Sequence, residues 1–216
     1  MKFGTDGLRG RYPSDMSEDV ARRAGAAAAA VFPGARILVG RDTRESGPSL
    51  LRAFVDGATS AGAPCTDLGV APTPAVAWLC RTHGCAGAVV TASHNPWKDN
   101  GVKLFAPGGT KLTDAQQDAV QSLLDRGGSP GGSAGEPDDG SSMRESWAAH
   151  LVDTVGPGSL DGLRIVVDCG HGALSDLAPG VVAALGATVV AVNDAPDGRN
   201  INDGCGAAHP SRLGGL

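Results

Sequence analysis

The amino-acid sequence predicts an α/β fold in which a mainly parallel, mixed sheet is covered by helices on both faces. Short apolar runs of strand length alternate with helical patterns of about 10–15 residues, an order typical of β-α-β units. The runs are apolar throughout, as expected for strands whose two faces are both covered. A second, shorter series begins after residue 142. We therefore expect a first domain over 1–142 and an incomplete α/β domain over 143–216.

The first domain opens with a helix and a strand. Ser17 can cap a helix over 17–31, because Glu18 and Asp19 favour its positive end and an alanine-rich body follows. The apolar run at 36–40 has the length of a strand. The other elements expected here are helices at 48–61, 73–82 and 113–124 (the last capped by Thr113), strands at 65–70 and 86–91, and an extended segment at 101–105.

The two domains meet at a segment of unusual composition. Residues 127–142 contain six Gly, four Ser and two Pro, which is typical of a flexible, exposed loop near a domain boundary. The second domain is small for an independent α/β unit, so it should be truncated, and we expect the weakly periodic residues after about Asn193 to exchange amide hydrogens quickly. Its expected elements are a connecting helix at 143–155, strands at 163–168 and 187–192, and a helix at 172–185.

Composition excludes several classes of function. Charged residues make up 19% of the 216 residues and the net charge is −5, which argues against a nucleic-acid-binding surface. No apolar run approaches the roughly 18–20 residues of a membrane span, and the N-terminus lacks the apolar core of a signal peptide. A small anionic ligand in a local pocket is compatible with this composition.

The cysteines indicate neither disulfides nor a zinc site. There are five, an odd number, and none form a C-x-x-C pair. We expect buried free thiols in a reducing compartment, and therefore a cytoplasmic protein.

The segment from Thr91 to Lys103 carries the strongest chemical signal. A buried strand delivers Ser93 to the carboxyl edge of the sheet, where open α/β sheets place their ligands. His94 follows directly, and Lys103 returns on the next extended segment. Alternatively, Ser93 and Asn95 only form a turn, with His94 exposed.

This segment favours phosphoryl transfer over acyl transfer. Side chains that neighbour each other in sequence usually diverge, so Ser93 and His94 do not suggest a triad, and there is no G-x-S-x-G motif. A serine that carries a phosphoryl group needs positive charge or donors around the phosphate oxygens and a base for the attacking hydroxyl. His94 and Lys103 are suitable groups. Trp97 either lines a sugar site or covers the sheet edge.

Two further loops carry weaker signals. Residues 3–10 contain three glycines that let the backbone approach a ligand, and Arg9 can bind a phosphate with two hydrogen bonds. Residues 40–44 follow a strand directly, and Arg41 and Asp42 form either an ion pair at the ligand edge or an ordinary surface pair. We expect all three loops near the carboxyl edge of one sheet.

In combination, these loops resemble the N-terminal half of the α-D-phosphohexomutase family, most closely its branch that acts on glucosamine phosphates. The serine loop is highly specific to that family, and the resemblance covers essentially the whole chain. The motifs Asn200-Ile-Asn202 and Cys205-Gly206 favour the glucosamine branch over phosphomannomutases. The matching motifs are Phe3-Gly-Thr-Asp-Gly-Leu-Arg-Gly10, Gly40-Arg-Asp-Thr-Arg44, Thr73-Pro-Ala-Val76, Thr91-Ala-Ser-His-Asn-Pro96, Asp99-Asn-Gly101 with Lys103, Gly109-Thr-Lys-Leu112, Val167-Asp-Cys-Gly-His-Gly-Ala173 and Asp197-Gly-Arg-Asn-Ile-Asn-Asp-Gly-Cys-Gly206.

The resemblance implies a role for each matching residue. Ser93 would be the phosphoserine that gives its phosphoryl group to one sugar hydroxyl and regains it from another. Lys103 and His94 would act as general base and acid, in an order that stays open. The residues implied to support the phosphoryl group or the substrate are Arg9, Arg41, Thr5, Asp6 and Asn95.

The resemblance also implies Mg²⁺, bound in part by a phosphoserine oxygen on Ser93, and a sugar bisphosphate as activator. The product would feed amino-sugar and cell-wall precursor synthesis. The family's Asp-Gly-Asp-x-Asp metal loop does not occur in this sequence, and Asp194, Asp197 and Asp203 are spaced too widely to replace it. One phosphoserine oxygen with water is a poor Mg²⁺ site, so we expect weak or no activity from this chain alone.

Two alternatives remain open. In the first alternative, the substrate is a mannose or glucose phosphate, as in the phosphomannomutases and phosphoglucomutases of the same fold. Alternatively, the chain is a non-catalytic fragment or one half of a split enzyme, with a second chain supplying the remaining domains.

Overall fold

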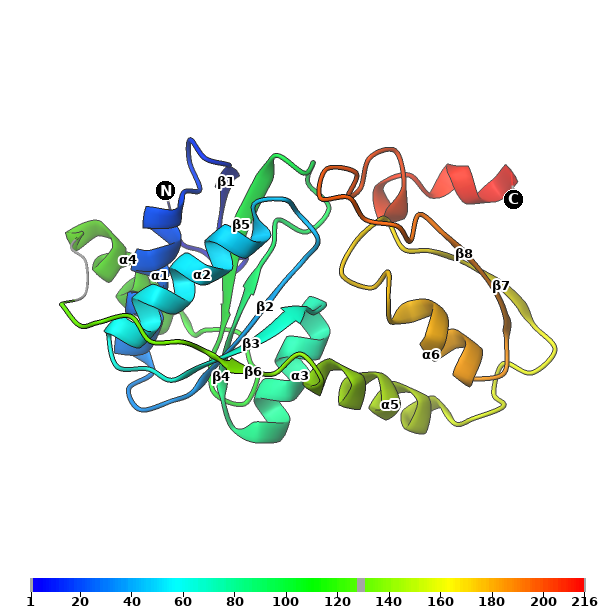
Figure 1. The fold of residues 1–216 in the computed structure, drawn as a ribbon, viewed down its shortest axis with the longest axis horizontal. Helices are drawn as coiled ribbons and strands as arrows, with labels where there is room; N and C mark the ends of the chain where they lie inside the picture. The colour runs from blue at the N-terminus through cyan, green and yellow to red at the C-terminus, as the bar shows by residue number, and fades with distance from the viewer. Residues whose placement is uncertain (1, 128–130, 216) are drawn as a thin grey trace.

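The computed structural model describes residues 2–127 and 131–215 and arranges them in two units that lie side by side (Figure 1). The larger unit contains a six-stranded sheet in the order β1-β5-β4-β2-β3-β6. Strands β2, β3, β4 and β6 are parallel, whereas β5 runs antiparallel to both β4 and β1. The expectation of a mainly parallel, mixed sheet is confirmed. The strands are β1 (Leu8–Arg11), β2 (Ile37–Arg41), β3 (Cys65–Val70), β4 (Ala86–Val90), β5 (Asp99–Phe105) and β6 (Asp138–Asp139).

Helices cover both faces of this sheet, as the apolar strands predicted. Along β2, Ile37 and Val39 pack into a cluster with the helices of one face, and Leu38 between them packs into a second cluster on the other face. This alternation follows from the two-residue period of a strand. The first face carries α1 (Glu18–Val31), α2 (Gly47–Ser60) and α4 (Asp114–Arg126), and the second carries α3 (Thr73–His83).

The helix starts follow the capping residues of the sequence. The Ser17 hydroxyl accepts a hydrogen bond from the Val20 amide, and Thr113 forms a capping box with Gln116. Helices α1 and α2 pack in close contact because each has a glycine there. A Cβ on Gly25 would lie 2.0 Å from the Phe54 carbonyl oxygen, and one on Gly57 would lie 1.9 Å from that of Arg22.

Three elements differ from the sequence-based expectation. Residues 8–11 form an edge strand, β1, although three glycines suggested only a loop. Asp138 and Asp139 pair with β3 as β6, inside the segment interpreted as a flexible loop, of which 128–130 lie outside the described residues. The helix expected at 172–185 is shorter, α6 (Ala178–Ala184), because Pro179 fits the first turn of a helix but not the interior of a longer one.

The second unit is a parallel pair of strands, β7 (Arg164–Asp168) and β8 (Thr188–Val192), with α6 and the connecting helix α5 (Met143–Val155). Two short 3₁₀ helices follow, η1 (Gly206–Ala208) and η2 (Pro210–Gly215). Helix α5 lies between the units and contacts both (Figure 1). Its His150 ring stacks on Trp78 of α3 with centroids 4.8 Å apart, and Trp147 is buried. The boundary at residue 142 therefore stays a prediction.

The five cysteines are free, as expected, and four are buried while Cys169 is half-buried. Burial raises the pKa of the Cys65 and Cys80 thiols to about 12. Among the described residues, no helix has the length and apolar character needed to cross a membrane.

Candidate active site

The serine loop is a tight turn directly after β4. The Asn95 amide donates to the Ala92 carbonyl oxygen at 3.2 Å, which closes the turn around Ser93 and His94. Ser93 has φ +57°, in the left-handed region that serine rarely adopts. Its amide donates to Thr91 Oγ1 at 3.0 Å, and its side chain is exposed. The loop therefore presents the Ser93 hydroxyl to solvent at the carboxyl edge of the sheet, on a constrained backbone.

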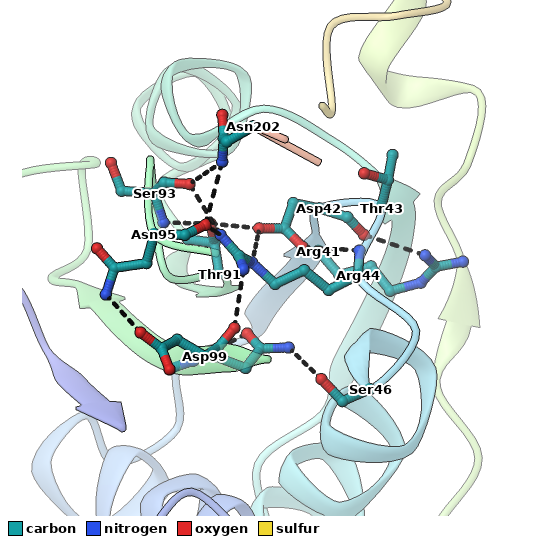
Figure 2. A network of polar contacts seen from close by, with 12 residues as sticks. Arg41, Asp42, Thr43, Arg44, Ser46, Thr91, Ser93, Asn95, Asp99 and Asn202 are labelled. Atoms are coloured by element: carbon teal, nitrogen blue, oxygen red, sulfur yellow. Dashed lines mark hydrogen bonds and ion pairs between the residues drawn. The ribbon is translucent and has the colours of Figure 1, made fainter. Parts of the chain in front are cut away.

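The constraint comes from one buried side chain, Arg44. Its guanidinium donates to four main-chain carbonyl oxygens of the serine loop, and it is fully buried beneath them (Figure 2). Arg44 Nη2 lies 2.9 Å from the Ser93 oxygen and 2.8 Å from the Asn95 oxygen. The other two acceptors are the carbonyl oxygens of Pro96 and Asp99. Five donors in a rigid plane suit arginine to this arrangement, which lysine could not reproduce.

Asp42 balances the charge of Arg44. Its Oδ2 accepts from Arg44 Nε at 2.9 Å and from Thr91 Oγ1 at 2.6 Å, and the aspartate is buried. The sequence left open whether Arg41 and Asp42 form an ion pair at the ligand edge or an ordinary surface pair, and both alternatives are wrong because the buried Asp42 pairs with Arg44. The Arg41 guanidinium donates instead to the main-chain oxygen of Asp42, because the chain turns after β2 and brings Arg44 back over the Asp42 carboxylate.

His94 and Asn95 lie where the sequence placed them. Contrary to the expectation that neighbouring side chains diverge, Ser93 Oγ and His94 Nδ1 are 3.4 Å apart, since the left-handed backbone at Ser93 tightens the turn. Asn95 is partly buried and donates to Asp99 Oδ2 at 3.0 Å. Its side chain thus braces the loop.

The N-terminal loop brings its charged residues to the neighbouring strands. Lys103 of β5 is 17% exposed, and its Nζ lies 3.6 Å from Asp6 Oδ1. Arg9 of β1 pairs in register with Gly101 of β5, and Gly101 also bonds to Thr91 at the start of the serine loop. In the described part of the chain, the buried Nε of Arg9 has no hydrogen-bond partner. Thr5 is exposed in the turn that precedes β1.

The second unit reaches the same edge. Thr43 Oγ1 donates to the His171 carbonyl oxygen at 2.6 Å. Asn202 Nδ2 donates to the Ser93 carbonyl oxygen at 3.0 Å (Figure 2). Arg199 pairs with Glu45 through two contacts of 2.7 and 3.0 Å. These contacts join the two units beside the serine loop, and of the three only that of Asn202 touches the loop itself.

Two cavities flank the serine loop. One of about 700 Å³ is lined by His94, Trp97, Lys98, Asn202 and His209 among others, and one of about 210 Å³ lies between Ser93 and the second unit. The larger has the volume of a typical small-molecule site. Trp97 lines it, and the Arg199 guanidinium lies 5.3 Å from the centre of the Trp97 ring.

The donor set does not fit a magnesium ion. In residues 2–127 and 131–215, no three His, Cys, Asp or Glu side chains are grouped so as to hold a metal. The two carboxylates that contact the serine loop and Arg44, Asp99 and Asp42, already accept hydrogen bonds within this network. Mg²⁺ requires about six oxygen ligands, which these residues do not supply on their own.

Two residues of this site were not singled out from the sequence. Arg44 and Asn202 lie within the motifs given above, but the sequence suggested no role for them. Each binds the carbonyl oxygen of Ser93, which is about 50 positions from Arg44 and over 100 from Asn202. Main-chain acceptors have no signature in a sequence.

The chain is similar to known proteins over most of its length. Residues 1–130 match the family model described as phosphoglucomutase/phosphomannomutase, alpha/beta/alpha domain I. The chain is 48% identical to the phosphoglucosamine mutase of Kineococcus radiotolerans and 46% identical to that of Symbiobacterium thermophilum, over 96% and 98% of its own residues. It spans about half the length of these curated relatives, 49% in each case.

Solved structures agree on the fold. A phosphoglucomutase/phosphomannomutase family protein from Burkholderia thailandensis superposes with a TM-score of 0.75 at 30% identity, covering 95% of this chain and 46% of that one. The phosphoglucomutase parafusin from Paramecium superposes with a TM-score of 0.71 at 17% identity, covering 92% of this chain and 44% of that one.

Proposed function

Because the chain belongs to the phosphoglucomutase/phosphomannomutase family of phosphohexomutases, we propose that it is the phosphoserine-bearing portion of a phosphoglucosamine mutase. This portion takes part in interconverting glucosamine 6-phosphate and glucosamine 1-phosphate through a sugar bisphosphate. The product serves amino-sugar and cell-wall precursor synthesis in the cytoplasm. The observation that carries the proposal is Ser93, an exposed hydroxyl held at φ +57° by the buried Arg44.

In the proposed reaction the phosphoryl group moves between two oxygens. The bond from phosphorus to Ser93 Oγ breaks as Ser93 Oγ takes up a proton from a general acid, and a bond from phosphorus to a sugar hydroxyl oxygen forms. The proton of that hydroxyl passes to a base, and Ser93 Oγ later regains the group from the other phosphate of the bisphosphate. His94, 3.4 Å from Ser93 Oγ, and Lys103 are the two groups suited to this proton transfer.

The remaining roles follow from charge and position. Arg9, whose buried Nε lacks a partner among the described residues, supplies positive charge to the phosphoryl group. Asp6 orients Lys103 through their 3.6 Å contact, and Thr5 lies in the same turn. Arg41 and Asn95 act indirectly, by shaping the loops that follow β2 and β4. Any Mg²⁺ would need ligands besides those of this chain, so no step is assigned to it.

The glucosamine branch is favoured over the alternative substrates by the relatives. Three curated relatives that are 43–48% identical to the chain are named phosphoglucosamine mutases. The name of the Burkholderia family member, which is 30% identical, covers both glucose and mannose phosphates. A mannose or glucose phosphate is the second candidate. Since the chain spans half of its relatives' length, a non-catalytic fragment or one half of a split enzyme is the alternative of another class.

Two linked assays test the proposal. The 216-residue chain is incubated with glucosamine 1,6-bisphosphate and Mg²⁺, and intact mass spectrometry follows transfer of one phosphoryl group. Glucosamine 6-phosphate is then added, with mannose and glucose 6-phosphates in parallel, and 1-phosphate formation is measured. Ser93→Ala, prepared identically, exposes contamination by host enzyme.

We expect the wild-type chain to gain one phosphoryl group and Ser93→Ala to gain none. Turnover should be weak, and highest with the glucosamine substrate. Failure of the wild-type chain to accept a phosphoryl group would contradict the proposal and favour the non-catalytic alternative. Higher turnover with mannose or glucose 6-phosphate would favour the second candidate.

A further inference from the structure

A single amide of the second unit holds the serine loop. Asn202 Nδ2 donates to the carbonyl oxygens of Ser93 at 3.0 Å and Asn95 at 3.3 Å (Figure 2). Arg44 Nη2 donates to the same two oxygens from below. Each of these carbonyls therefore receives one donor from each unit of the molecule.

Asn202 is itself held in place for this contact. Its main-chain N–H donates to the Gly170 carbonyl oxygen at 3.0 Å. Its backbone has φ +59°, in a region that asparagine tolerates better than most residues. The chain continues to Gly206, whose amide donates to Asp168 Oδ2 at 2.8 Å. The segment from 202 to 206 is thus tied at both ends to the loop after β7.

The two donors determine how the peptide between Ser93 and His94 faces. A peptide unit is planar and trans, so its carbonyl and its N–H point in opposite directions. Because the Ser93 carbonyl points to Arg44 and Asn202, the His94 N–H faces away from them, on the open side of the turn. Within the described residues this N–H donates to no protein acceptor. Hydrogen bonds to the carbonyl also polarise the N–H of the same peptide.

We propose that Asn202 is a positioning residue for the reactive serine: with Arg44, it orients the Ser93–His94 peptide so that the His94 N–H binds an oxygen of the phosphoryl group on Ser93. This inference rests on the proposed function, since that function places a phosphoryl group on Ser93. The second unit thereby contributes to phosphoryl transfer without touching the phosphate.

The decisive comparison uses Asn202→Asp in the full 216-residue chain. Aspartate has the shape of asparagine and tolerates the same backbone conformation, but its carboxylate cannot donate to the two carbonyls. Arg199→Gln is the matched control. It removes a different contact between the units, that of Arg199 with Glu45, three residues before Asn202, and it leaves the Asn202 side-chain amide in place. Asn202→Gly keeps the left-handed backbone and replaces the first variant if that variant does not fold.

Nuclear magnetic resonance provides a readout that does not depend on activity. In Asn202→Asp we expect the ¹⁵N resonance of His94 to shift and the Ser93 and Asn95 amides to exchange about tenfold faster, with β2 and β4 unchanged. Arg199→Gln should produce neither effect. Unchanged resonance and exchange in Asn202→Asp would overturn the inference.

Phosphoryl transfer from glucosamine 1,6-bisphosphate tests the catalytic consequence. We expect Asn202→Asp to accept the phosphoryl group about tenfold more slowly than Arg199→Gln, as for loss of one oriented donor. Equal rates in the two variants would overturn the positioning role. If the wild-type chain accepts no phosphoryl group, the proposed function fails and the phosphate contact with it, while the resonance comparison still decides whether Asn202 holds the loop.

Discussion

At the scale of single residues, the site depends on a side chain that never meets solvent. Arg44 and Asp42 form an ion pair with side chains 0% and 7% exposed, 2.9 Å apart. Such a pair is held in the interior by the extra hydrogen bonds that satisfy it, here four loop carbonyls and the Thr91 hydroxyl.

Breaking this pair should be strongly destabilising. Arg44→Met leaves a buried carboxylate without its cation and four carbonyls without donors, so we expect the free energy of unfolding to fall by about 3–5 kcal/mol. Urea denaturation measures it. Arg52→Met is the control, since Arg52 pairs with Asp56 and Glu136 on an exposed helix surface, and its urea midpoint should change little. Equal midpoints for the two variants would show that the buried network is not under the expected electrostatic constraint.

The contrast between Ser93 and Arg44 shows how far the sequence reaches at this scale. Ser93 was predictable because a buried strand followed by a short polar turn marks a ligand edge in an α/β sheet. Arg44 was not, because its acceptors are main-chain oxygens brought together only by the fold. Arg41 was predicted to pair with Asp42 on proximity in sequence alone, and the turn after β2 reverses that preference.

Asp168 gives the second unit a dependence on pH. Burial raises the pKa of its carboxyl, but hydrogen bonds from Asn193 and from the Gly170 and Gly206 amides outweigh it, and the pKa lies below its ordinary value. A lowered native pKa means stability that is present above the unfolded value of about 3.9 and is lost as the pH falls through the native pKa.

We therefore expect acid to loosen the loop after β7. As the pH falls from about 5 through the lowered native pKa of Asp168, the Gly170 and Gly206 amides should lose protection from exchange in the wild-type chain. In the Asp168→Asn variant, the protection of these amides should depend less on pH. A steeper dependence in Asp168→Asn than in the wild-type chain would contradict the sign of the pKa shift.

At the scale of elements, glycine marks where helices touch. Gly57 of α2 lies against the Arg22 carbonyl of α1, whereas a Cβ on Gly180 of α6 meets nothing within 4 Å. The same substitution should thus have opposite effects. Gly57→Ala should destabilise the protein because the helices must separate, and Gly180→Ala should stabilise it by up to about 1 kcal/mol through helix propensity.

Thermal unfolding of the two alanine variants distinguishes these effects. The melting temperature should fall for Gly57→Ala and stay equal or rise for Gly180→Ala. A fall of similar size in both would mean that helix packing at α1 and α2 is not the reason for the glycine at 57.

Elements were predictable where periodicity and caps coincide. Helices α1 and α4 begin after Ser17 and Thr113, as their side chains predicted. Strand β1 was not predicted, because four residues paired along an edge have no periodicity of their own and depend on β5 for their hydrogen bonds. The same holds for β6, two residues long, which depends on β3.

At the scale of the whole molecule, helix α5 decides where one unit ends. All buried members of the two hydrophobic clusters lie before residue 125, so a chain of residues 1–142 keeps its core. However, α5 adds the buried Trp147 and the stack of His150 on Trp78, and Arg144 Nη1 donates to the Val70 carbonyl oxygen at 2.9 Å. These contacts are with the first unit.

We expect chains of residues 1–142 and 1–155 both to fold, the longer one being more stable. Burying the α5 side chains should add about 2 kcal/mol, which corresponds to a melting temperature higher by roughly 5 °C for a chain of this size. Circular dichroism measures both. Equal melting temperatures would place α5 with the second unit and support a boundary at residue 142.

A more stable 1–155 would move the hinge to the residues after α5, where Gly156, Gly158 and Gly162 all have positive φ. In that case the second unit would be free to rotate about these glycines except for its contacts with Thr43, Glu45 and the serine loop, so the angle between the units and the orientation of the Ser93 peptide would change together.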